Sequence, residues 1–150
     1  MKKYVAIAIV VAVALSIMYE IEEETKAIRN IKIEINDATI ENIGVRYITI
    51  GINVSIINGE SRDIKNMKGN FEIYILNVSF GSAKLDEASI KSHSSFTTRI
   101  PLKIYYHNLT EGILNAIKEG NFDIKMKGKI TGKIFFGLLE YSQNVEARWH

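Results

Sequence analysis

The chain has 150 residues, with 19 lysine and arginine residues against 17 aspartate and glutamate residues, and it has no cysteine. This length predicts one domain, and the lack of cysteine excludes disulfides, a thiolate nucleophile and Cys-based metal sites. Two of the basic residues, Lys2 and Lys3, precede an apolar segment, so the rest of the chain is formally neutral. Nucleic-acid binding requires clustered positive charge, and we therefore expect no nucleic-acid partner.

Residues 1–19 have the sequence order of a membrane-targeting segment. An apolar run extends from Tyr4 to Tyr19 with no charge before Glu20, and its positive end is predicted to stay in the cytoplasm. A membrane-spanning helix needs about 20 apolar residues, so the run is short for an anchor and long for a signal peptide. We favour an uncleaved single-pass anchor with the C-terminal domain outside the cytoplasm. The alternative is secretion after signal cleavage near Ala12 or Ala14.

An acidic tract separates this segment from the rest of the chain. It contains Glu20, Glu22, Glu23 and Glu24, and we expect residues 20–27 to form a solvated spacer. The remaining residues, 28–150, are predicted to form the domain.

Residues 28–150 are dominated by short isoleucine-rich runs of period two, which indicate half-buried strands. The clearest run has apolar residues at 48, 50, 52, 54 and 56, and similar runs lie at 31–35, 71–75, 100–104 and 122–126. We expect turns between them at Asn58-Gly59, Gly69-Asn70, Gly81-Ser82 and Gly120-Asn121. Pro101 lies within one run and predicts an edge strand or a bulge there. Several strands at this spacing imply a sandwich or a barrel.

One segment has helical spacing, with apolar residues at 109, 113, 114 and 117. Asn108 is the expected N-cap, Glu111 follows three residues later, and Gly120 is the expected stop. The run from Lys129 to Trp149 is denser in apolar residues, and we expect a final pair of strands with a glycine bend or bulge.

No catalytic motif is evident. His93, His107 and His150 are scattered without the spacing of metal ligands. We therefore expect no catalytic residues, no cofactor and no metal.

Two sets of surface residues are candidate sites. Asn53, Asn77 and Asn108 each begin an Asn-x-Ser/Thr sequence and are candidate glycosylation sites, with Asn53 preferred because it lies on the polar face of its strand. Lys125, Lys127 and Lys129 line one side of a strand, where they either contact anionic headgroups or a polyanion, or keep the sheet face soluble.

The order of these pieces resembles the late embryogenesis abundant type 2 family, whose unit is the water-stress-and-hypersensitive-response (WHy) domain. The likeness covers about residues 28 to 149. It rests on an opening strand, the long strand ending in Asn58, Gly81-Ser82, the run from Thr98 to Ile104 around Pro101, and the short helix. After the helix, the run from Gly120 to Gly128 resembles a strand that ends in glycine in this family. The chain departs from the usual Asn-Pro of the family with Asn58-Gly59.

The resemblance implies an all-β, immunoglobulin-like or fibronectin III-like sandwich of about seven strands with one short helix, preceded by the N-terminal transmembrane or signal helix. It also implies a non-catalytic domain that binds or protects other proteins or the envelope surface under water or heat stress. The alternatives are a structural or interaction subunit of a cell-surface assembly and, less favoured, a small-ligand carrier or enzyme.

Overall fold

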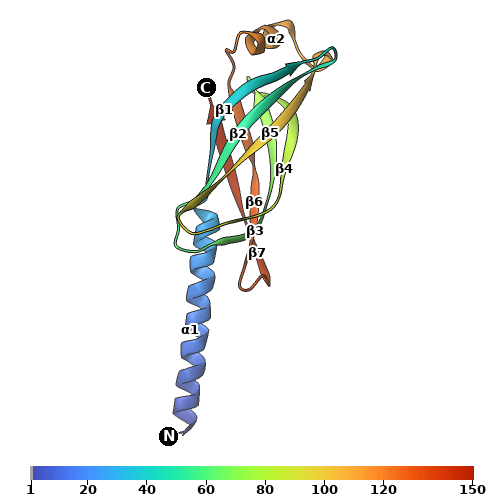
Figure 1. Cartoon of the computed structure of the whole chain (residues 1–150). Coiled ribbons are helices and arrows are strands. Elements are labelled where there is room, and N and C mark those ends of the chain that lie inside the picture. Colours follow the sequence, from blue (N-terminus) through green and yellow to red (C-terminus); the bar gives the residue numbers. More distant parts are fainter. Residues whose placement is uncertain (1) are drawn as a thin grey trace.

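The computed structural model describes residues 2–150 and consists of a long N-terminal helix that projects from a two-sheet β-sandwich (Figure 1). Helix α1 (Lys2–Arg29) precedes all the strands, and η1 (Tyr106–Asn108) and α2 (Glu111–Lys118) lie between the fifth and sixth strands. The strands are β1 (Lys32–Ile43), β2 (Tyr47–Asn58), β3 (Ile64–Ile75), β4 (Val78–Ile90), β5 (Ser94–Tyr105), β6 (Ile124–Ile134) and β7 (Leu139–Trp149). The predicted β-sandwich of about seven strands with one short helix and an N-terminal apolar helix is confirmed.

The two sheets are antiparallel and have the strand orders β1-β2-β5 and β4-β3-β6-β7. Because β4 pairs with β3, this division differs from that of immunoglobulin constant domains, in which the fourth strand joins the first, second and fifth. Strand β5 is an edge of the smaller sheet and carries Pro101 opposite Gly51. An edge tolerates a residue without an N–H group, and the edge prediction for Pro101 is confirmed.

The core lies between the sheets and follows the predicted period of two. In β2, the side chains of Ile48, Ile50, Ile52, Val54 and Ile56 are at most 1% exposed. The other predicted inward positions are also buried, apart from the half-buried Ile100. They are Ile31, Ile33, Ile35, Phe71, Ile73, Ile75, Leu102, Ile104, Phe122, Ile124 and Met126.

Two of the predicted turns are wrong. Gly69-Asn70 lies inside β3 and Gly81-Ser82 inside β4. A Cβ atom at Gly69 would lie 2.7 Å from the ring of Phe71, so this glycine makes room for a buried aromatic side chain. The turn between β3 and β4 is formed instead by Leu76 and Asn77, which both have positive φ. A two-residue loop with positive φ at both positions matches the right-handed twist of a hairpin.

The helix prediction is confirmed with a corrected start. The N-cap of α2 is Thr110 and not Asn108, because the Thr110 hydroxyl accepts a hydrogen bond from the Ile113 N–H. Gly120 ends the helix with a φ of 72°. The Asn121 N–H donates to the Ala116 carbonyl, and this bond satisfies one of the free carbonyls at the helix end.

Asn58, which the sequence places in a turn, is the buried polar side chain of the core region. Its amide nitrogen lies 2.8 Å from the Arg62 carbonyl oxygen and 3.2 Å from the Lys91 carbonyl oxygen. Its side-chain oxygen accepts a hydrogen bond from the Glu60 N–H. Asn58 thereby ties the β2–β3 connection to the end of β4 and satisfies carbonyl groups that would otherwise be costly to bury.

Candidate functional site

The apolar part of α1 projects away from the sandwich and is long enough and apolar enough to cross a membrane. From Tyr4 to Leu15 its large apolar side chains are each half or more exposed. A helix that is apolar on all sides is typical of a membrane span or of a fully buried helix. Because this one is exposed to its surroundings, it is compatible with a membrane anchor or a signal sequence.

The acidic tract is part of α1, whereas the sequence predicts a solvated spacer over residues 20–27. The helix continues to Arg29, and Ala27 and Ile28 are buried in the core of the sandwich. A Cβ atom at Gly132 in β6 would lie 2.7 Å from the Cδ1 atom of Ile28, so the helix packs closely against the larger sheet. The apolar segment therefore continues into the domain through a docked helix and not through a solvated linker.

Polar contacts reinforce this docking. Glu20 accepts hydrogen bonds from the Arg62 guanidinium at 2.8 and 3.2 Å, and this contact lowers the pKa of the Glu20 carboxyl group. Closer to the end of the helix, Glu60 forms an ion pair with Lys26 at 3.8 Å and accepts a hydrogen bond from the Asn30 amide at 3.0 Å. The helix end is thus held to the β2–β3 connection through both Arg62 and Glu60.

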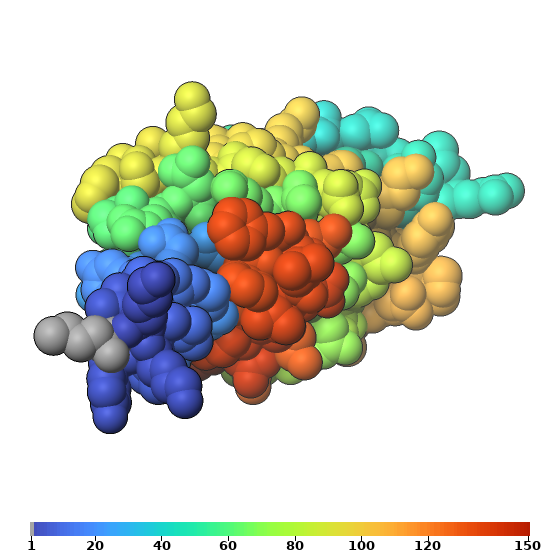
Figure 2. Space-filling model, turned by 90° about the horizontal axis from the view of Figure 1, so that it is seen from below, coloured from blue at the N-terminus to red at the C-terminus, as the bar shows by residue number. Residues whose placement is uncertain are grey.

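The β6–β7 hairpin ends beside α1. Its turn residues Phe135, Phe136 and Gly137 have φ values of 52°, 55° and 77°. The Phe135 N–H donates to the Glu24 carboxylate at 2.6 Å. Together α1 and the hairpin border a groove of about 570 Å³, whose apolar part is lined by Ala12, Val13, Ser16, Ile17, Phe135 and Phe136. Viewed along the helix from its N-terminal end, the orange-red hairpin adjoins the blue helix (Figure 2).

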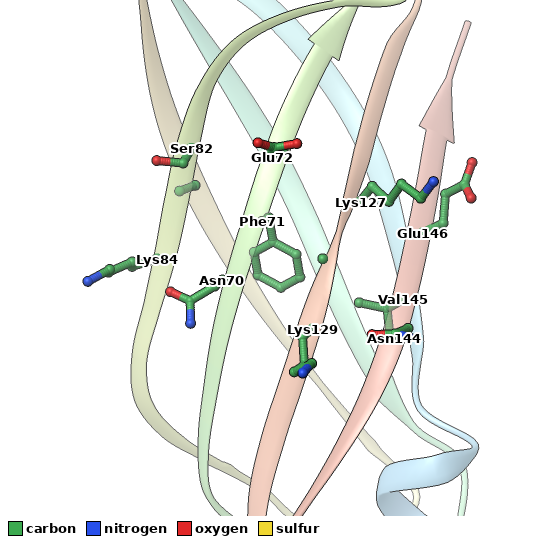
Figure 3. A pocket seen from close by; sticks show the side chains of 12 residues that line it. Asn70, Phe71, Glu72, Ser82, Lys84, Lys127, Lys129, Asn144, Val145 and Glu146 are labelled. Atoms are coloured by element: carbon green, nitrogen blue, oxygen red, sulfur yellow. The ribbon is translucent and has the colours of Figure 1, made fainter.

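A second candidate surface is the outer face of the larger sheet, where Lys127 and Lys129 lie (Figure 3) and Lys125 precedes them on β6. Lys125 is half-buried, and Lys127 and Lys129 are exposed. A shallow hollow of about 660 Å³ opens on this face above Phe71 and Gly128. The cross-strand neighbours are mixed in charge: Lys125 lies between Tyr74 and Arg148, Lys127 between Glu72 and Glu146, and Lys129 between Asn70 and Asn144.

These neighbours alter the electrostatics of the lysine row. The Lys125 ammonium lies 4.9 Å from the centre of the Tyr74 ring. The Glu146 carboxyl group has a lowered pKa because it accepts a hydrogen bond from Arg148 and lies near Lys125 and Lys127. The row is therefore partly neutralised across the strands and does not form a uniform cationic stripe.

The three asparagines of the Asn-x-Ser/Thr sequences differ in exposure. Asn53 is half-buried, and its amide donates to Asp37. Asn77 is exposed in the β3–β4 turn, since β3 ends at Ile75. Asn108 is exposed at the end of η1. The two turn asparagines therefore present freer side chains than the strand asparagine.

The histidines lie at three separate places. His93 lies in the β4–β5 turn, His107 is 5.8 Å from the Tyr105 ring, and His150 pairs with Asp123 at 3.1 Å. Within residues 2–150, no group of three or more His, Asp or Glu side chains is placed to hold a metal ion.

The hollow on the outer face of the larger sheet presents carboxylates and ammonium groups, which can bind charged partners by hydrogen bonds and ion pairs.

The expected final pair of strands with a glycine bend is present, with Gly137 in the turn between β6 and β7. The sequence does not reveal that Phe135 and Phe136 also belong to this turn, because Asn or Asp with Gly is usual at such positions. It also does not reveal the Arg62 contact. The partner of Glu20 lies 42 positions away, and no local pattern reveals it.

Comparisons with known proteins identify the fold. No protein-family model matches the chain, and no curated protein sequence matches it significantly. The solved structure of AT1g01470 from Arabidopsis thaliana has a TM-score of 0.55 and 19% identity, covering 77% of this chain and 76% of that one. The structural-genomics target SoR45 has a TM-score of 0.54 and 10% identity, covering 81% of this chain and 86% of that one.

A further solved neighbour, At2g46140.1, is described as a candidate late embryogenesis abundant (LEA) protein. It covers 95% of this chain and 86% of its own length, with 14% identity and a TM-score of 0.49. At these identities the likeness concerns the fold.

Proposed function

We propose that the chain is a non-catalytic, membrane-anchored domain of the late embryogenesis abundant type 2 (WHy) kind, which binds or protects proteins or envelope surfaces under water or heat stress. The sandwich lies outside the cytoplasm, and α1 stays uncleaved. The observation that carries the proposal is the course of α1, which runs without interruption from an exposed apolar segment into the core of the sandwich. Lys2 and Lys3 precede that segment and favour a cytoplasmic N-terminus.

Retention of the whole helix is supported by its contacts. Ser16, Ile17 and Glu20 line the groove against the β6–β7 hairpin, and Ala27 and Ile28 are buried. Cleavage after Ala12 or Ala14 would give a chain that starts at Val13 or Leu15, with Ile17 and other apolar residues exposed next to that groove. An uncleaved anchor keeps these side chains in lipid.

Anchoring is tested by replacing Ile9 and Val10 with arginine in the full chain. Each arginine near the middle of a spanning helix costs roughly 2.5–3.5 kcal/mol on insertion scales, so the doubly substituted chain is expected to leave the carbonate-resistant membrane fraction. The matched control is Val45→Arg, because Val45 is 96% exposed at the far end of the sandwich. The intact mass of the unaltered chain shows whether residues 1–19 are retained. It also shows any attached glycan, which we expect on the exposed Asn77 or Asn108 before the half-buried Asn53.

Either of two results contradicts the anchor: a soluble wild-type product lacking the N-terminal residues, or an unchanged membrane fraction for the arginine variant. A membrane-bound product of full mass supports it.

Protection of other proteins is tested with a heat-labile client enzyme. Vesicles carrying the full chain are expected to reduce client aggregation on heating or after drying, relative to empty vesicles of the same lipid. The physical reason is that the mixed-charge outer face, with Lys127 between Glu72 and Glu146, stays hydrated while it contacts partly unfolded chains. Equal light scattering from both vesicle samples would argue against a protective role.

A second candidate function is that of a subunit of a cell-surface assembly. It is favoured by the exposure of Ile43, the last residue of β1, at 58%, and of Val45 in the β1–β2 turn, at 96%. This turn lies at the end of the sandwich opposite α1 (Figure 1). Sedimentation of the detergent-solubilised chain as a defined oligomer would favour this role over that of a protective domain.

A further inference from the structure

The β6–β7 turn carries large apolar side chains that the sandwich does not cover. We define the hairpin tip as residues 135–139. Phe136 is 87% exposed, Leu138 is 72% exposed and Leu139 is 46% exposed. The rings of Phe135 and Phe136 lie 5.5 Å apart, so the two aromatic side chains pack next to each other at the tip. An exposed apolar cluster of this kind marks a site of interaction.

The backbone conformation of the tip also indicates an interaction site. Phe135 and Phe136 both adopt left-handed φ values, which are uncommon for bulky residues. Hairpins usually place Asn, Asp or Gly at such positions. Two phenylalanines bring strain to the turn, and the ring of Phe136 is exposed, whereas a lipid environment favours such side chains.

The tip lies beside the apolar segment of α1, and this position indicates what surrounds it. The groove between the tip and α1 is lined by Ala12, Val13, Ser16 and Ile17, which belong to the apolar segment that ends at Tyr19. At about 1.5 Å of rise per residue, these helix residues lie roughly 4–12 Å below Glu20 along the axis. If α1 spans a bilayer, a tip beside them is at the depth of the boundary between headgroups and acyl chains.

Charged groups lie just above the apolar tip. Lys65 on β3 pairs in register with Lys133 on β6, two residues before the turn begins. Lys65 also borders the groove, together with Glu20 and Glu24. Cationic side chains at this level match anionic headgroups, and long lysine side chains can reach the interface.

We propose that the hairpin tip inserts into the near leaflet of the bilayer that α1 spans, so that the sandwich is seated on the membrane at two points. This inference rests on the proposed anchoring by α1. Its occupant is the lipid acyl region, because the tip continues the apolar surface of the spanning helix. Two points of insertion hold the sandwich in one orientation, with α2 and the β1–β2 turn farthest from the lipid (Figure 1).

The test uses the full chain in lipid nanodiscs and takes advantage of the absence of native cysteine. Single substitutions Phe136→Cys and Leu138→Cys are labelled with an environment-sensitive fluorophore. Val10→Cys reports the centre of the spanning helix, and Val45→Cys reports the far end of the sandwich. Lipids carrying a nitroxide at a shallow or a deep acyl position are the quenchers, and circular dichroism checks that each variant is folded.

We expect the labels at 136 and 138 to lose about half of their fluorescence to the shallow nitroxide, as befits a depth of roughly 5–10 Å. The label at 10 should respond more to the deep nitroxide, and the label at 45 should respond to neither. Water-soluble iodide should quench the label at 45 severalfold more than the label at 136.

Quenching at 10 combined with water exposure at both 136 and 138 would overturn the insertion and leave the anchor intact. Absence of lipid quenching at 10 would overturn the anchor itself. Labels at 136 and 138 that are shielded from both iodide and nitroxide lipids would show that a second copy of the chain covers the tip, which also overturns insertion.

Discussion

Replacement of Gly128 by alanine is expected to destabilise the sandwich by about 3 kcal/mol, at the upper end of the cost of overpacking. A Cβ atom at this position would lie 2.0 Å from the backbone oxygen of Asn70 and 2.8 Å from the Cα atom of Phe71. Both atoms belong to the backbone of β3, so no change of side-chain rotamer relieves the contact. Strands β3 and β6 must separate, although their pairing joins the centre of the larger sheet.

The measurement is thermal unfolding of the full chain in detergent micelles, where a loss of this size lowers the midpoint by roughly 10 °C. Gly59→Ala is the matched control, because a Cβ atom at Gly59 has no heavy atom within 4 Å. The control should leave the midpoint unchanged or raise it slightly, since alanine restricts the unfolded chain. Equal midpoints for the two variants would mean that β3 and β6 are not as close at Gly128 as the structure has them.

Gly128 also shows where local sequence patterns succeed and fail. The alternation of Ile124 and Met126 with Lys125 and Lys127 correctly predicts which side chains face the core. The resemblance to the family implies a strand that ends at Gly128, yet β6 continues through this glycine to Ile134. Period two is a local property of a strand and is visible in one chain segment, whereas this glycine is required by the close backbone of Asn70 and Phe71 on the neighbouring strand β3.

The candidate sites also have some features that local sequence patterns predict and others that they do not. The lysine row is predicted correctly as one face of β6, because sidedness follows from alternation. The carboxylates that flank Lys127 are brought there by the register of β3 and β7, which the sequence does not specify locally. Likewise, Glu20 and Glu24 suggest a spacer until the fold places Arg62 and the Phe135 N–H beside them.

Replacement of Ile28 by alanine is expected to weaken the docking of α1 and to destabilise the chain by about 3 kcal/mol, within the range for buried isoleucine. Ile28 is 1% exposed and packs against Gly132 of β6. The truncation leaves a cavity at the point where the helix enters the core. Ile43→Ala is the matched control, because it removes the same atoms from a side chain that is 58% exposed. It should cost less than about 0.5 kcal/mol.

A double-mutant cycle shows whether the contact with β6 is responsible. Gly132→Ala alone places a Cβ atom 2.7 Å from the Cδ1 atom of Ile28 and should destabilise the chain. Ile28→Val removes that Cδ1 atom, so the alanine should cost less in this background, with a coupling of about 1 kcal/mol. Additive effects would mean that the helix end is not held against Gly132. In that case α1 would be a flexible tether, and the hairpin tip would not be fixed at the depth of Ala12 to Ile17. Coupled effects would support a sandwich whose orientation on the membrane is set by the rigid continuation of its anchor.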